Sequence, residues 1–189
     1  NMGGRIAQDQ DLSSWFSIRE VAGGSNNRQR LGAPPDLVVI AVQEFVALNG
    51  SQLLPSEAKK VDFERHALEM LGHAHGVPYA SVHPDGGREA PPQLAGLLTL
   101  VFVRAAEEDT SLAAPQLRIQ SAKTSLVPTG LGGLSGNKGG VAFRLTVAGI
   151  HLLFINLHLP SGAGKEPCEQ RNAAFADVLQ AAARDLQSN

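Results

Sequence analysis

The chain has 189 residues, of which 43% are hydrophobic and 18% are charged. This length and composition are typical of one globular domain with a sizeable core, and they exclude an intrinsically disordered chain. The formal net charge of -2 gives no overall basic field to attract nucleic acid, and the single cysteine, Cys168, excludes an intrachain disulfide framework.

The first half of the chain contains three apolar strand patterns and one helix pattern. Residues 37–42 are continuously apolar and mostly β-branched, which predicts a strand covered on both faces. Apolar residues recur at helical spacing over residues 56–76, where a Gly-x-Pro sequence predicts the end of the helix. A short strand is expected over residues 79–83, and a second buried strand over residues 94–104.

The second half predicts more strands and a final helix. Residues 116–127 have the mixed polarity of a half-buried strand, and a glycine-rich loop follows over residues 130–140. Residues 141–147 and 151–159 are expected to pair as a hairpin, which implies antiparallel pairing and a mixed sandwich with outer helices. The helix expected over residues 166–187 carries an apolar stripe: Phe175, Val178, Leu179, Ala182 and Leu186.

Glu44 is the first candidate for chemistry, because it follows closely on the six apolar residues of the strand over 37–42. An unpaired carboxylate beside a buried strand is costly. A divalent cation would offset that cost, and carboxylate oxygens suit Mg²⁺. The alternative is a carboxylate that turns to solvent or pairs with an arginine.

The glycine-rich loop is the second candidate. Six glycines fall between Gly130 and Gly140, and glycine permits a close approach of the backbone to a ligand. Asn137 and Lys138 are the strongly polar side chains of this run, and a lysine offers a mobile point charge to a phosphate. The run lacks the third glycine of the dinucleotide-binding fingerprint. The alternative is a flexible loop with a solvated lysine.

Asn156 and His158 are the third candidate. Their spacing of two places them on one face of a strand, after the apolar residues Leu152 and Phe154 on that face. His158 would hydrogen-bond to a phosphoryl oxygen or protonate it. The alternative is a histidine satisfied within the core. His151 is seven residues away, so it is expected on the opposite face.

Taken together, these segments resemble a known family. Residues 36–44 end in Gln-Glu, residues 94–104 form an apolar strand ending in Arg, and residues 129–141 read Thr-Gly-x-x-Gly-x-x-Gly-Asn-Lys-Gly-Gly-Val. Asn-x-His-Leu at residues 156–159 and Arg-Asn at residues 171–172 complete the set. The chain resembles the catalytic domain of the inositol polyphosphate 5-phosphatases, within the DNase-I-like endonuclease/exonuclease/phosphatase superfamily. The Gly-Asn-Lys-Gly-Gly segment distinguishes that family from the nuclease and sphingomyelinase branches.

The resemblance implies a fold and a metal site. The fold is an α+β, four-layer α/β/β/α sandwich. Glu44 would be the direct ligand of Mg²⁺, with Asn1 in the same metal site. His158 and Asn156 would form the catalytic pair, with His158 on the scissile phosphate and Asn156 positioning the site.

The resemblance also implies a substrate and a reaction. Asn137, Lys138, Arg171 and Asn172 would bind or position the inositol phosphates. Water would attack the 5-phosphate in line, with the metal offsetting the developing charge. The expected substrate is a phosphoinositide lipid or a soluble inositol polyphosphate, at a peripheral membrane surface, and no nucleic acid is expected to bind. The expected location is cytoplasmic.

The sequence also departs from the family. The family continues with a Gly-Asp-Leu-Asn segment, whose Asp activates water, and with a Ser-Asp-His segment, and neither string occurs here. Residues 1–189 are therefore expected to form the N-terminal part of a catalytic domain, truncated at both ends and inactive in isolation. The alternatives are a non-catalytic fragment or pseudoenzyme that binds phosphoinositide, or another phosphodiesterase or nuclease of the superfamily.

Overall fold

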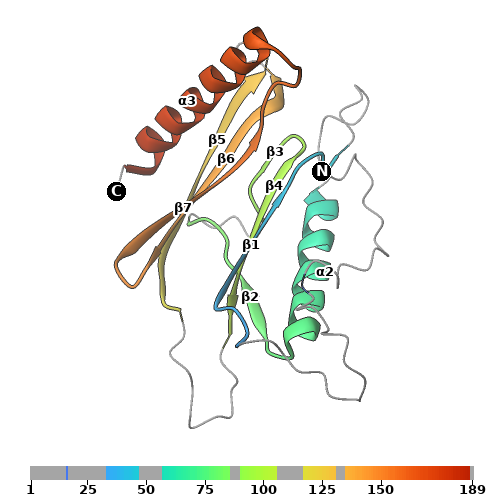
Figure 1. Cartoon of the computed structure of the whole chain (residues 1–189). Coiled ribbons are helices and arrows are strands. Elements are labelled where there is room, and N and C mark those ends of the chain that lie inside the picture. The colour runs from blue at the N-terminus through green and yellow to red at the C-terminus, as the bar shows by residue number, and fades with distance from the viewer. Residues whose placement is uncertain are drawn as a thin grey trace, which may run out of the picture.

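Two antiparallel β-sheets face each other, and one long helix covers the outer face of each (Figure 1). This arrangement confirms the predicted α+β class and the order α/β/β/α of the four layers. The computed structural model describes the backbone and side chains of residues 16, 33–46, 57–85, 90–105, 117–130 and 138–187, and the backbone of residues 135–137.

The first sheet has the strand order β1-β4-β2, with β1 at Leu37–Val42, β4 at Leu97–Arg104 and β2 at Tyr79–Ser81. All three are antiparallel to their neighbours, and Val42 is the register partner of Leu98. The predicted strand over residues 37–42 is confirmed, and the one over 79–83 is two residues shorter than expected.

The predicted strand over residues 94–104 is wrong at its start. Gln93–Leu94 form a separate short strand, β3, which folds back on the beginning of β4. The turn between them is made possible by Ala95, whose φ of 46° lies in the left-handed region. The side-chain amide of Gln93 donates to the Ala95 carbonyl at 2.8 Å and stabilises this turn.

The second sheet has the order β5-β6-β7, with β5 at Ile119–Gly130, β6 at Ser135–Val147 and β7 at Ile150–His158. The hairpin predicted across Ala148 and Gly149 is confirmed. The register pairs Gly139 with both Pro128 and His158.

The prediction of a loop over residues 130–140 is wrong for residues 135–140, because these residues belong to β6. Gly139 explains how a glycine-rich run continues a strand. Its φ is 148°, and a Cβ built there would lie 2.1 Å from the carbonyl oxygen of Val127. Only glycine permits this close approach of β6 to β5, and the approach brings Lys138 next to the end of β7.

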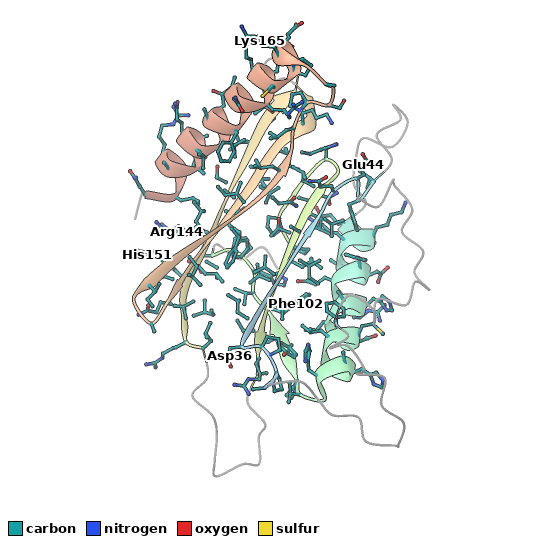
Figure 2. The ribbon with its side chains drawn as sticks, in the orientation of Figure 1. Asp36, Glu44, Phe102, Arg144, His151 and Lys165 are labelled. Atoms are coloured by element: carbon teal, nitrogen blue, oxygen red, sulfur yellow. The ribbon has the colours of Figure 1, made fainter. Side chains whose placement is uncertain are left out.

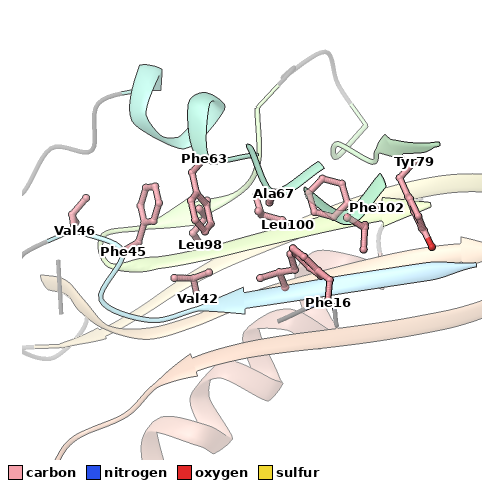
Figure 3. Close-up of a cluster of buried hydrophobic side chains, with 12 residues drawn as sticks. Phe16, Val42, Phe45, Val46, Phe63, Ala67, Tyr79, Leu98, Leu100 and Phe102 are labelled. Carbon is pink, nitrogen blue, oxygen red and sulfur yellow. The ribbon is translucent and has the colours of Figure 1, made fainter. Parts of the chain in front are cut away.

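Helix α2, at Glu57–His75, covers the outer face of the first sheet. Its residues Phe63, Ala67 and Leu71 pack into a cluster with the alternate residues of β1 and β4 that face the helix (Figure 3). Phe45, directly after Glu44, is fully buried in this cluster with its ring 5.4 Å from that of Phe63. The helix predicted over residues 56–76 is therefore confirmed within a residue at each end.

Helix α3, at Lys165–Gln187, lies along the outer face of the second sheet. The helix packs closely on the sheet at Gly140, where a built Cβ would lie only 2.6 Å from Val178 Cγ1. The predicted apolar stripe is wrong in part, because Phe175 and Leu179 are 42% and 38% exposed. The buried face keeps Val178, Ala182 and Leu186 of the predicted stripe and adds Ala174.

The space between the two sheets holds a separate core, in which Val101 of β4 contacts Phe143 and Leu145 of β6. Leu37 and Val39 pack against the same cluster, so β1 is contacted on both faces as predicted. Within the described ranges, no helix has the length and apolarity needed to span a membrane.

Candidate functional site

Glu44, Lys138 and His158 meet at one end of the sandwich. Glu44 is the second residue after β1, Lys138 lies in β6, and His158 is the last residue of β7. Lys138 Nζ lies 2.9 Å from His158 Nε2, and Glu44 Oε1 lies 3.9 Å from the same nitrogen. Figure 2 shows Glu44 at this end of the molecule and His151 at the far end, near the β6–β7 turn. The structure therefore brings together one residue from each of the three predicted groups.

The contact between Lys138 and His158 shows which atom of the imidazole accepts a hydrogen bond. A lysine ammonium group can only donate a hydrogen bond, so His158 Nε2 is the acceptor in this contact. The 3.9 Å separation of Nε2 from Glu44 Oε1 is too long for a hydrogen bond. The His158 side chain is 12% exposed and that of Glu44 is 32% exposed. The Nε2 atom of His158 thus has both the lysine and the carboxylate beside it, in a part of the molecule that solvent reaches.

The backbone at Glu44 is strained. Its φ of 52° is left-handed, which costs about 1 kcal/mol or more for a residue other than glycine. The buried ring of Phe45 and a 2.9 Å hydrogen bond from its amide to the Gly96 carbonyl anchor the next residue. This anchoring holds Glu44 in a turn that directs it away from the helix-covered core.

Asn156 lies two residues before His158 on β7, and it is 5% exposed. Its amide nitrogen donates to the carbonyl oxygens of Val42 and Leu98, both at 3.0 Å. The hydroxyl of Thr99 is further away, at 3.4 Å. Because a carboxamide has only two N–H groups, the two carbonyls use both of them. Asn156 therefore joins β7 to the opposite sheet, next to the candidate site.

Gln43 forms a second link between the sheets, and its only signal in the sequence is the Gln-Glu pair that it forms with Glu44. Its amide nitrogen donates to the Leu157 carbonyl at 2.6 Å. Leu157 directly precedes His158, so the residues adjacent to the two site residues are bonded to each other.

The other predicted site residues are placed differently. The Arg171 guanidinium donates to the carbonyl of Gly162 at 2.9 Å, with that of Pro160 at 3.4 Å, so it holds the loop that leads into α3. Asn172 is exposed on α3. Asn1 and the side chain of Asn137 lie outside the described residues. The roles expected for these four residues stay predictions.

The donor set at this end suits a hydrated ion. The described part of the chain has no group of three or more His, Cys, Asp and Glu side chains that would enclose a metal. Mg²⁺ does not need one, because it keeps several water ligands and binds proteins through one or two carboxylates. The partly exposed carboxylate of Glu44 fits that requirement.

Comparison with known proteins decides the family. Residues 1–188 match the model of the endonuclease/exonuclease/phosphatase family 2. The chain belongs to this family. The match covers both sheets and both long helices, in agreement with the DNase-I-like fold.

Several members of the family are similar over most of this chain. Human phosphatidylinositol 4,5-bisphosphate 5-phosphatase A is 44% identical over 164 residues, which are 86% of the chain and 14% of that protein. Phosphatidylinositol 3,4,5-trisphosphate 5-phosphatase 2B of Danio rerio is 29% identical over 180 residues, which are 95% of the chain and 12% of that protein. Rat synaptojanin-1 is 27% identical over 175 residues, covering 92% of the chain and 10% of that protein. The chain thus spans only a small part of the length of these relatives.

Proposed function

We propose that this chain forms part of the catalytic unit of a magnesium-dependent phosphatase. The whole protein would remove the 5-phosphate from a phosphoinositide or a soluble inositol polyphosphate. The observation that carries the proposal is the convergence of Glu44, Lys138 and His158 within 2.9 and 3.9 Å contacts at the end of the two sheets. A site that binds a phosphate monoester together with Mg²⁺ requires a carboxylate for the cation, and a lysine and an imidazole for the phosphate.

Lys138 and His158 would act on the phosphate itself. An arriving phosphate oxygen competes with His158 Nε2 for the Lys138 ammonium, because a charged acceptor forms the stronger hydrogen bond. Nε2, once protonated, would donate a hydrogen bond to a second phosphoryl oxygen. A bound Mg²⁺, held by Glu44, would polarise the phosphoryl oxygen and offset the charge that develops during the reaction.

The names of the relatives support the substrate class. Two of them are named as 5-phosphatases of phosphatidylinositol 4,5-bisphosphate and of phosphatidylinositol 3,4,5-trisphosphate. Both names specify a phosphate at the 5-position of an inositol lipid. We therefore propose the same bond as the target here, with the protein acting in the cytoplasm and at the membrane surface where such lipids lie.

Product analysis tests this function. The whole protein is incubated with Mg²⁺ and vesicles containing phosphatidylinositol 4,5-bisphosphate, and the lipid products are separated. We expect phosphatidylinositol 4-phosphate and one equivalent of inorganic phosphate. Binding to the vesicles without phosphate release would contradict catalysis and identify a pseudoenzyme. Cleavage of abasic DNA or of sphingomyelin instead would contradict the substrate class.

The metal role of Glu44 is tested separately by calorimetric titration with Mg²⁺. Glu44→Gln keeps the size of the side chain but loses its charge, so we expect a fall of about tenfold or more in Mg²⁺ affinity. Glu69→Gln is the matched control, since that glutamate is exposed on α2 and pairs with Arg65. Equal Mg²⁺ affinity of both variants would contradict the assignment of Glu44.

A further inference from the structure

Two hydrogen bonds join the end of β1 to the end of β7 in a reciprocal way. In one, the side chain of Gln43 donates to the main-chain carbonyl of Leu157 at 2.6 Å. In the other, the side chain of Asn156 donates to the main-chain carbonyl of Val42 at 3.0 Å. Each sheet therefore contributes one side-chain amide and one main-chain oxygen to the connection.

The two bonds share one register. Each joins residues that are 114 positions apart in the sequence. The next pair at that offset is Glu44 and His158, whose side chains lie 3.9 Å apart. The segments 42–44 and 156–158 are thus matched residue by residue, and the two bonds set which residue faces His158.

The two amides differ in their surroundings. Asn156 is 5% exposed and bonds to two carbonyls of the first sheet, so it also contributes to the core. Gln43 is half-buried and lies directly beside Glu44, in the layer of the site. Its single described bond ends on the residue before His158. Gln43 therefore links the segments that carry Glu44 and His158, and its contribution to the core is smaller than that of Asn156.

We propose that Gln43 is a positioning residue, which holds Glu44 and His158 in register across the two sheets through its hydrogen bond to Leu157. The inference rests on the proposed function for its kinetic consequence, although the geometry is measurable without catalysis. Glu44 needs such a constraint because its backbone is left-handed. Without the Gln43 bond, the turn after β1 could relax and move the carboxylate away from His158 and Lys138.

The test uses Gln43→Met, which keeps the length of the side chain and removes its donor. Gln120→Met is the matched control, because the Gln120 side chain also bonds to the main chain, at Gly149 N (2.7 Å) in the distant β6–β7 turn. Gln43→Asn is a second variant, since it keeps the amide but is one methylene too short to reach Leu157. It keeps the test decisive if Gln43→Met does not fold.

The first readout is the nitrogen NMR spectrum of the His158 imidazole in the whole protein. The contact with Lys138 predicts a ring whose Nε2 accepts a hydrogen bond, and the two nitrogen signals report any change in that contact. We expect Gln43→Met or Gln43→Asn to shift these signals, and Gln120→Met to leave them unchanged. Unchanged His158 signals in the Gln43 variants would overturn the proposal, whether or not the protein is a phosphatase.

The second readout is the split between kcat and KM. Displacement of two groups that act together lowers kcat by about tenfold or more and changes KM less than about twofold. In a His158→Ala background the same Gln43 variant should cost less than it does in the unmodified protein, because one of the two groups that it holds in register is gone. An equal loss in both backgrounds would overturn the proposal. Absence of phosphatase activity in the unmodified protein would contradict the proposed function, and the imidazole spectrum would still decide the geometry.

Discussion

His158 Nε2 accepts a hydrogen bond from Lys138 Nζ at 2.9 Å across the pairing of β6 with β7. Gly139, the residue after Lys138, is the register partner of His158, so the pairing of β6 with β7 brings the backbones of Lys138 and His158 close together. A basic side chain is thereby held beside an imidazole at the edge of the sandwich. Substrate binding would replace this contact between two protein side chains with contacts to a phosphate.

Lys138→Met tests the phosphate-binding role of the lysine. The loss of one charge-assisted hydrogen bond of about 1.5–3 kcal/mol should lower kcat/KM by about 10- to 100-fold, mainly through KM. The measurement is steady-state hydrolysis of phosphatidylinositol 4,5-bisphosphate by the whole protein. Lys165→Met is the control, because Lys165 is 89% exposed at the start of α3. If both variants have the same KM, Lys138 does not bind the substrate.

Gly139→Ala tests the close approach of β6 to β5. A Cβ would lie 2.1 Å from a main-chain oxygen, which cannot move without breaking the ladder, so we expect a loss of more than about 3 kcal/mol in the free energy of unfolding. Gly149→Ala is the control, because its φ is also positive, at 80°, but nothing lies within 4 Å of the new Cβ. It should cost about 1 kcal/mol. Equal costs in urea denaturation would show that backbone conformation alone requires glycine at residue 139.

Tyr79→Phe tests a contact at the opposite end of the first sheet. The phenol donates to the Pro35 carbonyl at 2.9 Å and is 8% exposed, and its burial raises the pKa of Tyr79. Arg104 lowers this pKa and Asp36 raises it by smaller amounts. The folded protein therefore keeps the proton at a pH where the unfolded chain releases it. The stabilisation is complete below about pH 10, the ordinary pKa of tyrosine, and is lost as the pH rises through the higher folded value.

The substitution should remove about 1 kcal/mol from the free energy of unfolding at neutral pH, for the lost hydrogen bond. It should also flatten the decline of that free energy above about pH 10. Urea denaturation at both pH values measures the two effects. Tyr79 is the only tyrosine in the chain, so its phenolate absorbance reports the same titration directly. An identical alkaline decline in Tyr79→Phe would contradict this explanation.

The local pattern of the sequence was sufficient for most elements and for the three residues that meet at the site. Glu44 stands out because it closely follows a continuous apolar strand, and His158 because it ends a strand face that begins with Leu152 and Phe154. Lys138 could be predicted because it lies in a glycine-rich run that also matches a family motif. Periodicity and short motifs depend only on residues that are neighbours in the sequence, so they predict features of this local kind.

The contacts between the sheets could not be predicted in the same way. Gln43 and Leu157 are 114 residues apart, and nothing in the periodicity of either strand specifies their register. The extension of β6 through Gly139 was missed because glycine normally indicates a loop, and here a close backbone contact overrides that tendency. The exposure of Phe175 on α3 has a similar cause, since Val178 packs closely over Gly140 and the buried face is centred there.

The central claim is that His158 acts on the phosphate, and a pair of histidines on β7 offers the most direct test. His151 is exposed on the opposite face of the strand and bonds to Thr146, at the far end from Glu44 (Figure 2). In the Mg²⁺-dependent hydrolysis of phosphatidylinositol 4,5-bisphosphate by the whole protein, His158→Ala should lower kcat/KM by about 100-fold or more, and His151→Ala by less than about twofold. Hydrolysis by His158→Ala at the rate of the unmodified protein would contradict the account.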